Sequence, residues 1–122
     1  MKYLIEKEII IEGIKIFISL IRLHKSFLLL ISDQEDLGIG NVTLGTPPII
    51  KDLKSSTSSY HLFGLDRKLL SNIIAEKASS SLKKPVLLLL FLKTKKDDKE
   101  IIKPLIKFLN DIFEEIISEE KE

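Results

Sequence analysis

The chain has 122 residues, contains no cysteine, and balances 19 lysine and arginine residues against 18 aspartate and glutamate residues, for a formal net charge of +1. This length is typical of one domain, and the hydrophobic share of 44% is sufficient for a core that needs no metal or disulfide. The lack of cysteine excludes a disulfide scaffold and thiolate zinc sites, and the near-neutral charge argues against a dedicated nucleic-acid-binding protein.

The apolar segments of the chain are too short to cross a membrane. The longest uninterrupted one, residues 86–92, falls far short of the ~20 residues that a membrane-spanning helix requires. Near the start of the chain, Glu6, Lys7 and Glu8 interrupt the apolar stretch that a secretion signal would need. We therefore expect a cytoplasmic protein that does not associate with membranes.

The first third of the chain predicts strands. Residues 1–12 contain a run of isoleucines, which favours a strand over a frayed helical turn. Residues 14–23 place isoleucine or leucine at every second position over most of their length, which is the period of a strand. A short polar break at residues 24–26 separates them from the apolar residues 27–32, so the two segments predict a hairpin.

The middle of the chain alternates between strands and loops. The acidic residues 33–36 form a loop or a single helical turn, after which residues 37–44 resume as a strand. Residues 45–48, with the sequence GTPP, end that strand because proline has no N–H group to donate to a sheet. Residues 49–59 are rich in serine and are predicted to be a mobile loop, and residues 60–63 form a short strand.

An amphipathic helix followed by an apolar strand is the most regular part of the sequence. Apolar residues recur at helical spacing over residues 66–82, and Pro85 then forces an extended chain. Residues 86–92 are apolar without interruption, which predicts a strand buried on both faces. The residues most strongly predicted to lie in the core are Leu69, Ile73 and Leu88.

The last segment predicts a second helix, with candidate N-cap residues at 97–98. Because Pro104 fits a helix only in or near its first turn, the helix is expected to begin at Glu100 or Ile101. Its adjacent apolar pairs form a face wide enough to cover a sheet, or to provide an association surface if partly exposed. The tail, residues 118–122, is expected to fray because the helix dipole disfavours acidic residues at that end.

Together these segments predict one α+β domain over residues 1–122. The expected order is β-β-β-β-(β)-α-β-α, where the bracketed strand is the short segment 60–63. Because the strands come first and only one follows a helix, we expect a largely antiparallel sheet of five to six strands with two helices.

Residues that could bind a metal are few. His24 and His61 are the only histidines, and they could join Asp33, Glu35 or Asp36 in a site. Their spacing matches no known ligand pattern, and His24 falls in the predicted hairpin turn. We therefore interpret them as ordinary polar residues and expect no metal.

The glycines at 38, 40 and 45 have a superficial likeness to a phosphate-binding loop. Such a loop requires a helix directly after it, and here a strand and two prolines follow. The glycines are better explained by a bulge or by close approach of the backbone to another segment.

Nucleophilic catalysis is also poorly supported. Ser58 or Ser59 beside His61 would need a base within reach and an oxyanion hole, and no G-x-S-x-G turn is present. We expect no enzymatic activity and no cofactor.

Several segments follow one another in a recognisable order: KIFISLIRL, SFLLLIS, GNVTLGTP, HLFG, the acidic Asp66, SNIIAEKASSSLKKP and PVLLLLFL with its closing helix. Over residues 14–117 they resemble the small proteasome assembly chaperones of the third and fourth eukaryotic types and their archaeal relatives. The helix that ends in lysine and proline before a buried strand contributes most to the resemblance.

The resemblance implies a non-enzymatic chaperone that binds proteasome α-type subunits and promotes assembly of the 20S α-ring. It also implies a dimer, either of identical chains or with a paralogue, and no cofactor. It transfers no binding residues, so we place the partner contacts on the two polar loops, where interaction residues are often found. The predicted partner-binding residues are Gln34, Glu35, Asp36, Lys51, Asp52 and Lys54.

Two alternatives remain open at this point. A roadblock- or longin-like dimeric scaffold for small GTPases, or another protein-interaction module, has a similar helix-strand-helix ending. A roadblock domain is expected to begin with a helix, so a strand-first order would count against it. An enzyme with an unrecognised site would require a polar pocket with converging Asp, His and Lys side chains.

Overall fold

The computed structural model describes residues 2–36, 38–47, 56–61 and 67–120. These residues form six strands and two helices, which confirms the predicted α+β class and the order of the elements. The elements are β1 (Lys2–Ile11), β2 (Ile14–Leu23), β3 (Ser26–Ser32), β4 (Asn41–Thr46), β5 (Ser56–His61), α1 (Lys68–Leu82), β6 (Val86–Phe91) and α2 (Asp98–Glu120).

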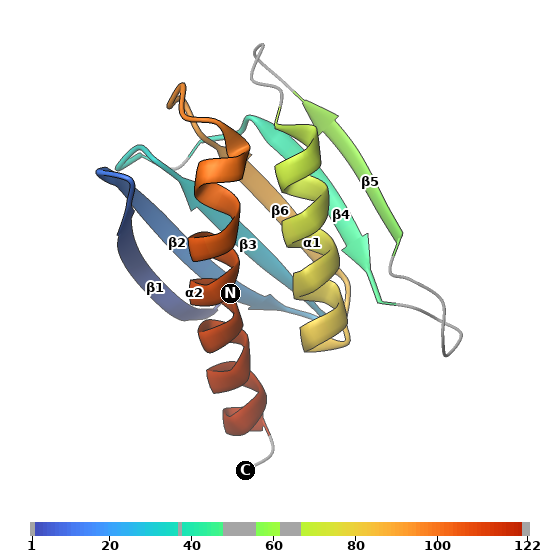
Figure 1. Cartoon of the computed structure of the whole chain (residues 1–122). Helices are drawn as coiled ribbons and strands as arrows, with labels where there is room; N and C mark the ends of the chain where they lie inside the picture. Colours follow the sequence, from blue (N-terminus) through green and yellow to red (C-terminus); the bar gives the residue numbers. More distant parts are fainter. Residues whose placement is uncertain (1, 37, 48–55, 62–66, 121–122) are drawn as a thin grey trace.

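The strands form one sheet in the order β1-β2-β3-β6-β4-β5. Only β3 and β6 run parallel; every other neighbouring pair is antiparallel, as predicted. Both helices lie side by side on the same face of this sheet (Figure 1). The molecule therefore has two layers, and we call the helix-covered side of the sheet the inner face and the opposite side the outer face.

Two tight turns set the register of the first three strands. Glu12 and Gly13 join β1 to β2 with φ values of 50° and 77°, and Lys25 has a φ of 53° in the turn between β2 and β3. Two-residue turns with positive φ match the twist of the strands they join. The predicted hairpin is confirmed, with Phe17 opposite Ser32 and Leu23 opposite Ser26.

The core lies between the inner face and the helices. Residues at every second position of the central strands are buried there, and α2 contributes a stripe that includes Ile101, Leu105, Leu109 and Ile116. The adjacent Ile102, Ile106, Phe108 and Ile117 are partly buried against the same cluster. The broad apolar face of α2 is therefore explained by packing on the sheet.

The helix α1 is rotated relative to the sequence prediction. Leu69 was expected in the core but is 67% exposed, and Ile73 is only half-buried; Leu88 is fully buried as predicted. The buried side of α1 instead combines apolar with small and polar residues: Leu70, Ser71, Ile74, Ala75, Ala78, Ser79 and Leu82. A count of apolar residues alone misses Ser71 and Ser79, which are fully buried.

Several element boundaries differ from prediction, and the strand predicted at residues 37–44 is β4, which runs from Asn41 to Thr46. The helix α2 begins at Asp98, with Asp97 accepting a bond from the Lys99 N–H at 3.3 Å, so Pro104 lies a full turn inside the helix. The helix also continues through residues 118–120, which were expected to fray. The strand β5 begins at residue 56, inside the predicted mobile loop, while residues 49–55 lie outside the described residues.

Two side chains tie the loop before α2 to the rest of the molecule. Arg67, just before α1, donates to the carbonyl oxygens of Thr94 and Lys96, and to Asp98 at 2.6 Å. Asp33, at the end of β3, accepts from the backbone N–H groups of Lys93 and Thr94 at 3.0 and 2.7 Å. Asp33, considered above as a metal ligand, is thus occupied in fixing this loop.

Candidate protein-interaction surface

The strand β6 shows that one face of the sheet is left open. Its residues alternate between buried and half-buried, with Val86, Leu88 and Leu90 on the inner face. The prediction that this strand is buried on both faces is therefore wrong. The reason is that both helices cover the same side of the sheet (Figure 1). Leu87, Leu89 and Phe91 occupy the alternate positions of the strand and are only half-buried.

Apolar side chains continue in rows across the outer face. Ile21 of β2 pairs with Leu28 of β3, which pairs with Leu87 of β6, which in turn pairs with Leu44 of β4. A second row joins Leu30, Leu89 and Val42. Together with Phe17 and Phe91, these residues form the outer-face patch: Phe17, Ile21, Leu28, Leu30, Val42, Leu44, Leu87, Leu89 and Phe91.

Most of this patch remains partly accessible to solvent. Leu44 is 44% exposed, Ile21 is buried by its neighbours, and the others are half-buried. Contiguous apolar area on a sheet face is characteristic of a surface that binds another protein. The outer face is therefore the strongest candidate for an interaction site among the described residues.

The loop after β3 borders one end of the patch. A Cβ atom on Gly38 would lie 2.8 Å from the ring of Phe91, so the backbone packs directly on that ring. The Lys93 amine lies 5.6 Å from the centroid of the same ring. The prediction that the glycines mark close backbone approaches is confirmed at Gly38 and, against α1, at Gly45.

A hollow of about 430 Å³ lies beside the patch, where β1 and β2 meet this loop. Phe17 and Ser19 line it from β2, and Glu6, Glu8 and Glu35 contribute carboxylates. Ser19 is only 6% exposed, whereas the three glutamates are exposed. The outer face thus combines an apolar patch with an acidic hollow at one side.

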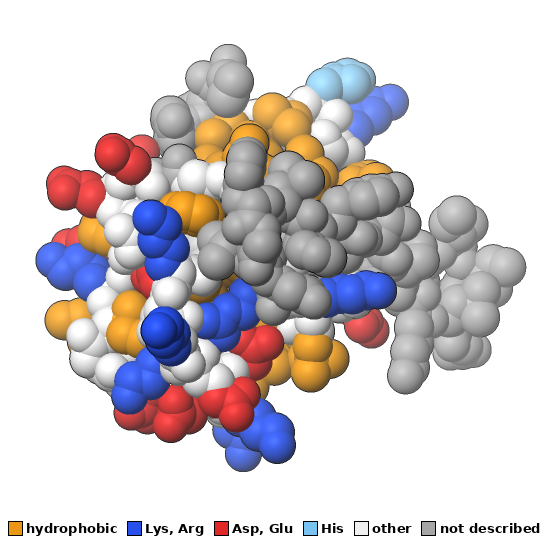
Figure 2. Space-filling model, turned by 90° about the horizontal axis from the view of Figure 1, so that it is seen from above, with side chains coloured by type: hydrophobic (Ala, Val, Ile, Leu, Met, Phe, Trp, Pro, Cys, Tyr) orange, Lys and Arg blue, Asp and Glu red, His pale blue; other side chains and the backbone are white. Residues whose placement is uncertain are grey.

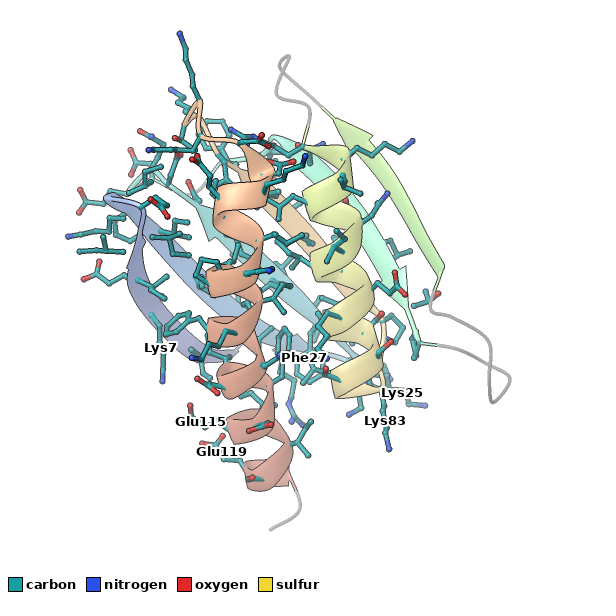
Figure 3. The ribbon with its side chains drawn as sticks, viewed as in Figure 1. Lys7, Lys25, Phe27, Lys83, Glu115 and Glu119 are labelled. Carbon is teal, nitrogen blue, oxygen red and sulfur yellow. The ribbon has the colours of Figure 1, made fainter. Side chains whose placement is uncertain are left out.

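The rest of the visible surface carries both charge signs. Figure 2 shows lysine and arginine side chains interspersed with acidic ones among the coloured residues. On the helix side, Lys7 of β1 pairs with Glu115 of α2 at 3.3 Å, and Phe27 lies in the core near Arg22 and Lys84 (Figure 3).

Three of the six predicted partner-binding residues are described by the structure, and one of them lies at the outer face. Glu35 lines the hollow and Asp36 is exposed, while Gln34 is half-buried and its backbone N–H donates to the Ser32 hydroxyl at 2.9 Å. Residues 51, 52 and 54 lie outside the described residues. The role of all six as partner-binding residues stays a prediction.

The outer-face patch was not predicted from the sequence. Its signal was present in the apolar residues at both alternating positions of β3 and β6, such as Leu28 and Leu30 beside Leu29. For residues 86–92 this pattern was interpreted as burial on both faces. Because both helices lie on one side of the sheet, which a single sequence does not reveal, the same pattern indicates an uncovered apolar face.

The described part of the chain offers little chemistry of other kinds. In it, no group of three or more His, Asp or Glu side chains could hold a metal ion. His24 lies exposed in the turn between β2 and β3, and His61 is in β5, opposite Asn41. Among the described helices, none is both long and apolar enough to span a membrane.

Comparison with known proteins identifies a similar fold. No model of a known protein family matches the chain, and no curated protein matches it by sequence. A solved structure described as a novel chaperone complex for yeast 20S proteasome assembly aligns with a TM-score of 0.61, covering 97% of this chain and 96% of that chain. The sequence identity is 9%, so this likeness concerns the fold.

Proposed function

We propose that this protein is a non-enzymatic, cytoplasmic assembly chaperone that binds proteasome α-type subunits and promotes formation of the 20S α-ring. The proposal is supported by the fold it shares, over nearly its full length, with a chain of a yeast proteasome-assembly chaperone complex. Most of the segments that resemble this chaperone family in sequence lie on described elements of this chain, between β2 and α2.

The observation that carries the proposal is the outer-face patch. A chaperone that binds a folded subunit and then leaves needs an accessible apolar surface that does not destabilise the free protein. Half-buried leucines on a sheet provide such a surface, since neighbouring side chains already shield part of each leucine from water. A specific interface typically requires about 800 Å² from each partner, which is comparable to one face of a sheet of this size.

The alternative scaffold for small GTPases is less well supported. Five strands precede the first helix in the described chain, and a roadblock domain is expected to begin with a helix. We also propose that the chaperone acts as a dimer, with itself or with a paralogue, as the family resemblance implies.

The test is binding of the purified protein to individual proteasome α-type subunits from the same organism. Each subunit is mixed with the protein at micromolar concentration and analysed on native gels and by size-exclusion chromatography. The expected result is a new complex with at least one subunit, and faster formation of the α-ring when the protein is present. Absence of a complex with every α-type subunit would overturn the proposal.

A further inference from the structure

The acidic hollow beside the outer-face patch has a composition that the apolar character of the face does not explain. Its carboxylates come from three places: Glu6 and Glu8 on the edge strand β1, and Glu35 in the loop after β3. In the sheet, Glu6 lies opposite Ser19, and Glu8 lies opposite Phe17. All five side chains therefore meet on the outer side of the first two strands.

The negative charge of this hollow is largely uncompensated. Among the described residues, the side chains of Glu6 and Glu35 form no ion pair, and Glu8 has only a 3.9 Å contact with the exposed Lys15. Lys7 also borders the hollow, but its amine pairs with Glu115 on the helix side. The nearby lysines therefore leave the hollow negatively charged.

The hydroxyl of a buried serine adds a second, independent indication of a ligand. Ser19 is more than nine-tenths buried, and its side chain forms no hydrogen bond with another described residue. Its oxygen is not one of the fully enclosed side-chain atoms, so a group that enters the hollow can reach it. A serine oxygen can accept a hydrogen bond from a cationic N–H group.

The positions of the carboxylates and the ring of Phe17 indicate which class of ligand the hollow can bind. The three carboxylates are not arranged to bind a single metal ion. Among the described residues, no group of three or more His, Asp or Glu side chains could hold one. A larger organic cation can reach carboxylates on different sides of a hollow. The half-buried ring of Phe17 offers the cationic group of such a ligand an aromatic surface. The same ring offers the aliphatic part of the ligand an apolar contact.

We propose that this hollow binds a lysine or arginine side chain of the protein that docks on the outer-face patch. The aliphatic stem lies against Phe17, and the cationic group is held by Glu6, Glu35 and the Ser19 hydroxyl. Only the identity of the partner rests on the proposed function; the site itself is defined by residues of this chain. The hollow would then select partners that carry a basic residue next to an apolar surface.

The test uses small probes and two-dimensional NMR of the isotope-labelled protein. N-acetyl-lysine-methylamide and N-acetyl-arginine-methylamide are titrated, with N-acetyl-norleucine-methylamide as the uncharged control. The expected result is saturable shifts at the amides of Glu6, Phe17, Ser19 and Glu35 with the cationic probes only. Added salt should weaken this binding, because the carboxylates are exposed.

Substitutions provide the matched controls. Because the substitutions remove two of the carboxylates that attract the cation, the double variant Glu6→Gln with Glu35→Gln should bind the cationic probes at least about 10-fold more weakly. Ser19→Ala removes only the neutral acceptor and should weaken binding by about 3- to 10-fold. The variant Glu114→Gln with Glu119→Gln, on the exposed side of α2, should leave binding unchanged.

Three results would overturn the inference: no shifts at the hollow, equal shifts with the norleucine probe, or unchanged binding in the Glu6 and Glu35 variant. Because the probes contain no proteasome subunit, these outcomes are independent of whether the protein binds α-type subunits. A positive result with the probes, combined with no complex on native gels, would retain this site and reject the proposed function.

Discussion

A Cβ atom built on Gly45 of β4 would lie 2.5 Å from the carbonyl oxygen of Ala75 in α1. The helix therefore approaches this strand so closely that only a hydrogen atom fits between them at this position. Ala78, Ser71 and Ser79 are also fully buried on α1, so small side chains make up much of its buried side. The contact fixes how near, and in which rotation, the helix lies on the sheet.

Gly45→Ala is expected to destabilise the protein, because the obstacle is helix backbone and not the end of a flexible side chain. Overpacking a core typically costs about 1–3 kcal/mol, and we expect a loss in the upper part of that range. Urea unfolding followed by circular dichroism measures it. Leu44→Ala, at the adjacent exposed position on the outer face, should cost much less; equal losses would contradict the close contact.

This contact also shows where sequence reasoning about the fold reaches its limit. The order of strands and helices follows from local patterns and was predicted. The rotation of α1 depends on which residues are small enough to approach β4, and serines were not considered for the core. Leu69 was chosen because it is apolar, yet the close approach at Ala75 places it in solvent.

Arg67 is expected to contribute more to stability than an exposed ion pair does. Its guanidinium reaches two carbonyl oxygens and Asp98, with the two charged side chains only 14% and 24% exposed. A lysine amine cannot reproduce this planar arrangement of donors. Arg67→Lys should therefore reduce the free energy of unfolding by about 2 kcal/mol.

The matched control for Arg67 is the pair between Lys7 and Glu115, whose side chains are 43% and 47% exposed. Lys7→Gln should cost less than about 1 kcal/mol, because exposed ion pairs contribute little. Both variants are compared by urea unfolding at the same ionic strength. A loss for Lys7→Gln as large as that for Arg67→Lys would refute the assigned role.

The outer-face patch is tested by placing charge at its centre. In the variant Leu30→Lys with Leu89→Lys, a complex with an α-type subunit should weaken at least about 10-fold, as expected when central interface residues are disrupted. Both positions are half-buried, so the fold should persist, which circular dichroism checks. Leu69→Lys, on the exposed side of α1, is the control and should bind normally.

Sedimentation velocity of the same variants identifies which protein occupies the patch. If the unmodified protein is a dimer and the double variant is a monomer, a second copy covers the outer face. If the oligomeric state is unchanged while subunit binding is lost, the client covers it. Normal subunit binding together with an unchanged oligomeric state would exclude the patch as an interaction surface.

The candidate surface was only partly predictable, because strand pairing brings together residues that are distant in the sequence. Glu35 was placed correctly in a loop, and it lines the hollow, but Glu6, Glu8 and Ser19 come from strands in another part of the chain. The pairing of β1 with β2 brings them together, and a sequence without homologues does not reveal which loop borders that pair. Likewise, the apolar run of β6 indicates two apolar faces without indicating what covers each one.

Pro104 provides a prediction in which a substitution should stabilise the protein. It lies six residues after the first residue of α2, on the exposed side of the helix, so no N–H is available to donate to the Glu100 carbonyl. A proline inside a helix costs about 3 kcal/mol, part of which is offset by about 0.4–1 kcal/mol because proline also restricts the unfolded chain. Pro104→Ala should thus increase the free energy of unfolding by about 2–2.6 kcal/mol.

The urea midpoint of Pro104→Ala is compared with that of Lys103→Ala, which is also exposed and keeps its backbone N–H. The lysine variant should change stability by less than about 0.5 kcal/mol, as is usual for exposed positions. If Pro104→Ala instead lowers the midpoint, the helix must begin after Asp98, near Glu100, where proline would lie in the first turn. The helix start predicted from the sequence would then be correct, and Arg67 would bind Asp98 in the loop before α2.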